Sequence, residues 1–82
     1  MPVNTGGTAM YAQTIGKRIR ILRKKSSLTQ AELAERLYVS NNTISSWERD
    51  RTRPDITIIV QIAEIFHVSL NYLLVGEKKI TL

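Results

Sequence analysis

The stretch Leu28-Thr-Gln-Ala-Glu-Leu-Ala-Glu-Arg-Leu-Tyr-Val-Ser-Asn-Asn-Thr-Ile-Ser-Ser-Trp-Glu48 decides the fold of this chain. It contains two short amphipathic helical patterns, which are separated by a three-residue break at residues 38–40. Thr29 followed by Glu32 is a capping-box signature and predicts that the first helix starts there. The apolar side of this helix consists of Leu33, Ala34 and Leu37.

The second pattern predicts a helix from Asn41 to about Arg49, with Ser40 as its N-cap. At about 100° per residue, Ile44 and Trp47 point together into a core. The opposite side carries Asn42, Ser45, Ser46 and Arg49, with Asn41 in the first exposed turn. Asparagine amides match N6 and N7 of adenine in the major groove, and serine hydroxyls can bond to either kind of base edge. An ordinary solvent-exposed helix carries the same residue types, so this face alone leaves both interpretations open. The capped helix before it and the length of the break favour DNA recognition.

Helical periodicity also extends upstream, where it begins at Thr14. Ile15, Ile19 and Leu22 recur at helical spacing, and the pair Ser26–Ser27 ends this helix. Basic residues occupy its other faces, namely Lys17, Arg18, Arg20, Lys24 and Lys25.

Downstream of the central stretch, residues 50–54 form a basic loop, and Pro54 suits the start of a fourth helix. The core face of that helix consists of Ile59, Ile62, Ala63 and Phe66. A short fifth helix, Leu70 to Leu74, follows Val68–Ser69 and is closed by Gly76. Strand-like alternation is confined to Lys79–Leu82. We therefore expect an all-α fold, a compact five-helix bundle over residues 14–76, with an N-terminal flexible tail at 1–13 and a C-terminal tail at 77–82. Met1 and Met10 are both candidate initiator residues.

The bulk composition restricts the class of protein further. Eighty-two residues, of which 43% are hydrophobic, suit one globular domain. The chain has no cysteine, which excludes a disulfide framework, a cysteine-ligated zinc site and a thiol nucleophile, and it fits a reducing cytoplasm. No apolar run has the length of a membrane span, and the N-terminus lacks the apolar region of a signal peptide. A net charge of +5 favours polyanionic partners, nucleic acid first and acidic lipid second.

These elements, taken in order, resemble the Cro/CI (Xre) family of helix-turn-helix repressors over about Ile15 to Glu77. Leu28–Ala34 corresponds to the first helix of the family's motif, and Val39–Glu48 corresponds to its recognition helix. Pro54–Ala63 and Val68–Leu74 match the family's helices four and five. The resemblance implies a lambda-repressor-like DNA-binding domain with the helix-turn-helix at its second and third helices. A match of one element alone is weak evidence for the family, whereas a match of all five elements in order is specific for it.

The resemblance also implies roles for individual residues. Base reading falls to Asn41, Asn42 and Ser46, with Ser45 a weaker candidate. Contacts to the DNA backbone fall to Gln30, Thr43, Arg49, Arg51 and Arg53. The alternative for Gln30 is a plain exposed helix residue, and for the arginines it is a solvated run of charge. Arg23 and Glu48 would form a largely buried ion pair that orients the recognition helix and has no catalytic role.

Three positions depart from the family pattern, which commonly has glycine there. Tyr38 lies in the turn of the motif, where a left-handed conformation would strain a bulky residue by about 1–3 kcal/mol. The alternative is that this turn differs slightly from the family's, which would also change the docking angle of the recognition helix. Asp50 tolerates a left-handed conformation better. His67, the one histidine, is interpreted as a helix terminator rather than a metal ligand.

A second copy of the chain is the expected protein partner, because family members usually bind inverted repeats as homodimers. Candidate dimer residues form an apolar set: Ile58, Ile65, Tyr72, Val75, Ile80 and Leu82. The alternative is that these side chains simply widen the core contact of a small domain.

The sequence thus predicts a sequence-specific, double-stranded DNA-binding regulator, a repressor, in a bacterial or phage-infected cytoplasm and associated with the nucleoid. The alternative is a helix-turn-helix module that binds a regulatory protein, of the antitoxin or anti-repressor type. An enzyme is disfavoured because the acidic residues are scattered and no Gly-rich phosphate loop is present. No cofactor and no metal are expected.

Overall fold

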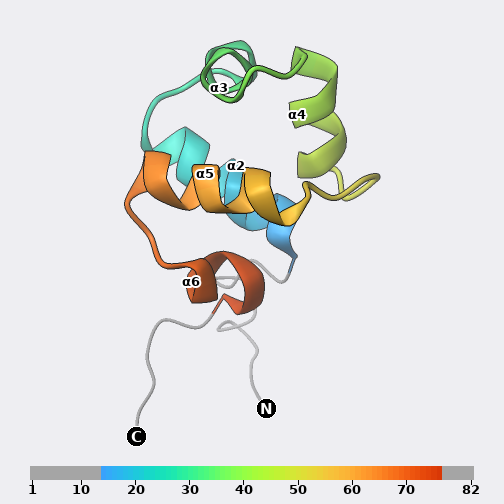
Figure 1. The fold of residues 1–82 in the computed structure, drawn as a ribbon. Coiled ribbons are helices and arrows are strands. Elements are labelled where there is room, and N and C mark those ends of the chain that lie inside the picture. Colours follow the sequence, from blue (N-terminus) through green and yellow to red (C-terminus); the bar gives the residue numbers. More distant parts are fainter. Residues whose placement is uncertain (1–13, 77–82) are drawn as a thin grey trace, which may run out of the picture.

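Each helix in the part of the chain that the structure describes begins at a side chain whose oxygen accepts a hydrogen bond from the backbone N–H three residues further on. The structure, a computed structural model, describes residues 14–76, and this part of the chain forms five helices (Figure 1). They are α2 (Ile15–Lys25), α3 (Gln30–Leu37), α4 (Asn41–Glu48), α5 (Ile56–Phe66) and α6 (Leu70–Val75). Their N-caps are Thr14, Thr29, Ser40, Asp55 and Ser69. Such a cap satisfies a backbone N–H that has no partner within its own helix. The predicted capping box is confirmed, because Thr29 and Glu32 exchange both of its hydrogen bonds.

The five helices surround one core to which each of them contributes a completely buried side chain. These side chains are Ile19, Leu33, Ile44, Ile62 and Leu73, all with 0% exposure. Complete burial of such an aliphatic side chain stabilises the fold by about 1.5–3 kcal/mol. In Figure 1, α2 passes behind α5, α3 and α4 lie side by side at the top, and α6 lies below. The all-α bundle predicted from the sequence is confirmed for the described residues.

Several chain reversals use a left-handed backbone at residues other than glycine. Tyr38 ends α3 with φ 59° and ψ 43°, and His67 ends α5 with φ 57° and ψ 44°. Of the two alternatives for Tyr38, the left-handed conformation is the one observed, and the predicted helix-terminating role of His67 is confirmed. Ser27, at φ 59°, adopts the same conformation without having been anticipated. Gly76 closes α6 at φ 78°, as its residue type predicts.

Tyr38→Gly is expected to raise the free energy of unfolding by about 1 kcal/mol, because glycine adopts this backbone without steric strain. Little packing is lost, since the Tyr38 side chain is 93% exposed. Urea denaturation followed by circular dichroism measures the difference. Tyr38→Ala is the matched control, because it removes the ring and keeps the strain. Equal stability of the glycine and alanine variants would contradict the interpretation.

Arg18, which the sequence placed among the basic residues outside the apolar face of the first helix, is buried in the structure. Its side chain is only 5% exposed and reaches the C-terminal end of α6. Its Nε donates to the carbonyl oxygen of Leu73 at 2.8 Å, and its Nη2 donates to that of Leu74 at 3.0 Å. These carbonyls are among those that the end of a helix leaves without an intrahelical partner. Burial lowers the pKa of Arg18, while electrostatic interactions with Tyr72 and Asp50 act in the opposite direction.

The predicted start of the fourth helix also needs correction. Pro54 precedes the cap instead of opening the helix, because the carboxylate of Asp55 accepts from the backbone N–H of Ile58 at 3.0 Å. Phe66, predicted to be on the core face, is half-buried and packs against the core. The predicted tails, the possible strand at Lys79–Leu82 and two dimer candidates, Ile80 and Leu82, lie outside the described residues.

Candidate nucleic-acid interface

Helix α4 presents two sides of opposite character. Ile44 and Trp47 are buried, so they fix this helix to the core. Asn41 and Asn42, at its N-terminal end, are exposed, whereas Ser45 and Ser46 are half-buried. The most accessible polar side chains of α4 therefore gather at its first turn. α4 forms one edge of the fold beside α3 (Figure 1).

The cap of α4 also engages Thr43. The Ser40 hydroxyl accepts from the Thr43 backbone N–H at 3.1 Å, and the two hydroxyl oxygens lie 2.9 Å apart. Thr43 is half-buried, so its hydroxyl lies at the margin of the exposed surface. The start of a helix also carries a partial positive charge, which favours an approaching anion.

A buried charged pair joins α4 to α2. Arg23 Nε donates to Glu48 Oε2 at 2.6 Å, and its Nη2 donates to Oε1 at 2.9 Å, which makes the pair bidentate. Nη1 donates to the carbonyl oxygen of Leu28 at 2.8 Å, in the loop before α3. The hydrogen bond to Glu48 raises the pKa of Arg23 even though burial acts against it. This bidentate, charge-assisted pair holds α4 against α2.

Gln30, at the first position of α3, belongs to the same network. Its Nε2 donates to Glu48 Oε1 at 3.0 Å, so its side chain is held in place and half-buried. The amide nitrogen has a second N–H that can serve a further acceptor. The N-terminus of α3 and the side of α4 thus meet at one carboxylate.

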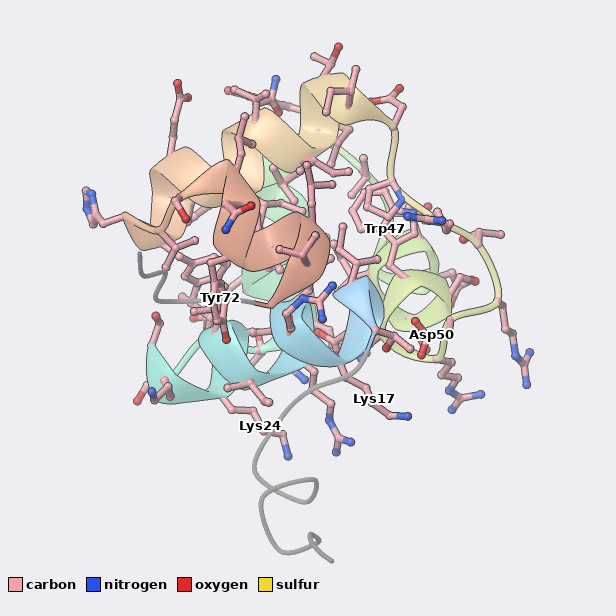
Figure 2. The ribbon with its side chains drawn as sticks, turned by 90° about the horizontal axis from the view of Figure 1, so that it is seen from below. Lys17, Lys24, Trp47, Asp50 and Tyr72 are labelled. Carbon is pink, nitrogen blue, oxygen red and sulfur yellow. The ribbon has the colours of Figure 1, made fainter. Side chains whose placement is uncertain are left out.

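Three arginines follow along the chain from α4. Arg49 is its C-cap, and Arg51 and Arg53 lie in the next loop; all three are exposed. The Arg51 backbone N–H donates to the carbonyl oxygen of Ser46 at 2.9 Å, which fixes the start of this loop against α4. On α2, Lys17 and Lys24 project from the side away from α5 and α6 (Figure 2).

The predicted dimer residues divide between core and surface. Ile58, Ile65 and Tyr72 are half-buried and pack against the core, as the alternative interpretation had it. Val75 is 60% exposed. Two partly exposed apolar side chains on α6, Leu70 and Leu74, were not predicted from the sequence. Their spacing along this short helix is also the spacing of side chains that face a core, so periodicity alone did not identify Leu70 and Leu74 as exposed.

One further contact was missed. The Thr14 hydroxyl donates to Asp50 Oδ2 at 2.9 Å, which joins the start of α2 to the residue after the C-cap of α4. Thr14 and Asp50 are 36 positions apart in the sequence. The sequence hinted at this contact only in that Asp50 occupies a position where the family commonly has glycine.

Among residues 14–76, no three His, Cys, Asp or Glu side chains are grouped so that they could hold a metal ion. Within the same range, no helix is long and apolar enough to cross a membrane.

A capped helix, a short left-handed turn and a second helix with an exposed polar N-terminus define a helix-turn-helix domain. The sequence model of the helix-turn-helix family matches residues 19–73. The chain belongs to this family, within its Cro/CI (Xre) type.

Individual relatives show the same likeness. The chain is 39% identical over 61 residues to the transcriptional regulator ImmR of Bacillus subtilis, covering 74% of this chain and 48% of that protein. It is 40% identical over 68 residues to repressor protein C2 of Salmonella phage P22, covering 83% of this chain and 32% of that protein. The chain thus spans about half or less of the length of these curated relatives.

Solved structures agree with this assignment. The P22 c2 repressor in complex with a synthetic operator matches with a TM-score of 0.75 and 39% identity, over 80% of this chain and 100% of that one. The complex of SinR with SinI matches with a TM-score of 0.67 and 35% identity, over 74% of this chain and 60% of that one.

Proposed function

We propose that this protein is a sequence-specific, double-stranded DNA-binding transcriptional regulator that acts as a repressor. The observation that carries the proposal is the exposure of Asn41 and Asn42 at the N-terminal end of α4, whose other side is fixed in the core by Ile44 and Trp47. A recognition helix enters the major groove by its N-terminal residues. The similar P22 c2 repressor was solved with an operator, which supports the proposal.

The first contribution to DNA binding is electrostatic. The net charge of +5 attracts the duplex, and cations released from the phosphates favour association. Arg49, Arg51 and Arg53 extend from the C-terminal end of α4 and its loop, where they can reach a phosphate strand beside the groove. Gln30 uses its second amide N–H on a phosphate while Glu48 holds the first. Thr43 supports the same strand through its hydroxyl.

Base recognition follows once the backbone contacts set the register. Asn41 and Asn42 are long enough to donate to and accept from adenine edges. Ser46, half-buried, reaches the base edges by a shorter side chain, and Ser45 contributes less. Glu48 and Arg23 hold the helix that presents these groups.

A homodimer would place two copies of α4 about 34 Å apart, which is one turn of the duplex, on an inverted repeat. Val75 is the most exposed of the dimer candidates among the described residues, and Leu70 and Leu74 lie on the same short helix. Repression then follows from occupation of a promoter in a bacterial or phage-infected cytoplasm.

Asn42→Ala is expected to weaken binding to the preferred duplex by about 1–3 kcal/mol, because one base contact is lost. The preferred duplex is obtained by selecting random duplexes with the wild-type chain. Fluorescence anisotropy with every single-base variant of that duplex measures the effect. The discrimination should disappear at one base pair of each half-site and remain at the others. A uniform loss on all duplexes would remove Asn42 from the base-reading set.

Arg51→Ala provides the matched contrast within the same surface. It should weaken the preferred and the randomised duplex alike and reduce the slope of log affinity against log salt by about one. An unchanged slope would show that Arg51 makes no phosphate contact.

A second candidate function is recognition of a regulatory protein. It is favoured by the exposed apolar side chains of α6, Leu74 and Val75, and by the similarity to SinR, which was solved in complex with SinI. Substituting both residues with serine should abolish such a complex and leave the intrinsic DNA affinity of each subunit intact.

A further inference from the structure

Helix α4 is attached to α2 at two places that lie far apart along α2. The first is the Arg23–Glu48 pair in the C-terminal half of α2. The second is at the start of α2, where Thr14 and Gly16 contact the end of α4 and the residue beyond its C-cap. Figure 2 shows Asp50 beside the first turn of α2, with Lys17 close by and Trp47 directed inward.

The second attachment brings backbone against backbone. A Cβ atom added to Gly16 would lie 2.0 Å from the carbonyl oxygen of Trp47 and 2.5 Å from Asp50 Oδ1. The backbone oxygen of Trp47 leaves no room for a Cβ atom, so glycine is required for this approach. The last turn of α4 therefore rests directly on the first turn of α2.

Asp50 completes this contact even though its backbone adopts an unfavourable, left-handed conformation. Its φ is 61°, a value that glycine adopts more readily, and its N–H donates to the Trp47 carbonyl oxygen at 3.0 Å. Its carboxylate accepts from the Thr14 hydroxyl at 2.9 Å, while the same hydroxyl oxygen caps α2 by accepting from the Lys17 backbone N–H. The first turn of α2 contains no acidic residue, so Asp50 supplies a negative charge at the positive end of that helix.

Thr14 and Arg23 are separated by about 13 Å along α2 at the usual helical rise. Ile44 and Trp47 anchor α4 in the core, and the two separated attachments to α2 together restrict the direction of its axis. We propose that Asp50 is a positioning residue for DNA recognition, which fixes the direction of α4 through Thr14 and the Gly16 contact. This inference rests on the proposed function, because its consequence is base selectivity. Asp50 is assigned no contact with DNA.

Two substitutions break the hydrogen bond in different ways. Asp50→Gly removes the carboxylate and relieves the backbone, so the two effects on stability oppose each other. Thr14→Asp keeps an equally good helix cap and removes the hydroxyl donor. Asp50→Asn is the matched control, because it retains an oxygen acceptor and tolerates positive φ.

The first measurement is the ratio of affinities of the full 82-residue chain for its selected duplex and for a randomised duplex of equal length. This ratio should fall about tenfold for Asp50→Gly and for Thr14→Asp, as expected when base contacts are misplaced. Asp50→Asn should keep it within about twofold. The melting temperature of Asp50→Gly should stay within about 5 °C of wild type. Wild-type ratios in both Asp50→Gly and Thr14→Asp, or an equal loss in Asp50→Asn, would overturn the inference.

The second measurement uses no DNA and separates this inference from the proposed function. Residual dipolar couplings of backbone amides report the direction of α4 relative to α2. Both disruptive variants should rotate α4 by more than about 10°, the tolerance within which a binding site must be held. An unchanged direction would overturn the positioning role, whatever the DNA results. A wild-type chain that selects no duplex would instead overturn the proposed function.

Discussion

Replacing Glu48 with alanine is expected to lower the free energy of unfolding by about 3–5 kcal/mol, because it leaves the charge of Arg23 buried without its partner. Arg23 keeps only the Leu28 carbonyl oxygen among the acceptors described above, and Gln30 loses its acceptor as well. A lost surface ion pair would cost about 1 kcal/mol or less, so the size of the effect identifies the pair as buried. Urea denaturation at neutral pH measures it.

The control for this result replaces both charged partners with apolar residues. Arg23→Met combined with Glu48→Leu should recover most of the lost stability, since a buried ion pair often contributes little beyond a packed apolar pair. The double variant should nevertheless bind the selected duplex more weakly, because Gln30 no longer has Glu48 to hold it. A loss below about 1 kcal/mol in Glu48→Ala would contradict the buried pair.

Replacing Ile44 with alanine is expected to cost about 2–5 kcal/mol, the range for a buried aliphatic side chain whose removal leaves a cavity. Ile44 is completely buried and lies on the side of α4 opposite the exposed asparagines. Ile44→Val should cost only about 0.5–1.5 kcal/mol, since one methylene group is removed.

Thermal and urea unfolding of both Ile44 variants provide the comparison. The valine variant should also retain the base preference of wild type. If alanine and valine cost the same, then Ile44 does not anchor α4 in the core.

The helices were predictable because their starting signals are local. Thr29, Ser40 and Ser69 each act on a backbone N–H within the next turn, so a few adjacent residues contain the whole signal. The same holds for the buried side of α4, which helical periodicity identifies from Ile44 and Trp47.

The missed features depend on residues distant in the sequence. Arg18 is buried because carbonyl groups at the end of α6, 55 and 56 positions away, accept its hydrogen bonds. Asp50 meets Thr14 only after α4 has packed against α2. A charged residue on an amphipathic helix gives no sign of such partners, and its expected place is the solvent.

The residues of the candidate site divide in the same way, into those predictable from local sequence and those that depend on distant parts of the chain. Exposure of Asn41 and Asn42 follows from their position on the helix, whereas the half-buried state of Ser45 and Ser46 depends on neighbouring elements. The position of Gln30 was assigned through resemblance to known repressors. Its hydrogen bond to Glu48 connects residues 18 positions apart and required the folded arrangement.

Selection from a library of random duplexes, read out together with the mass of the complex in solution, tests the central claim most directly. We expect one enriched motif with two inverted half-sites about 10 base pairs apart, bound by two copies of the chain. Equal recovery of all sequences would contradict the claim that the first turn of α4 reads bases.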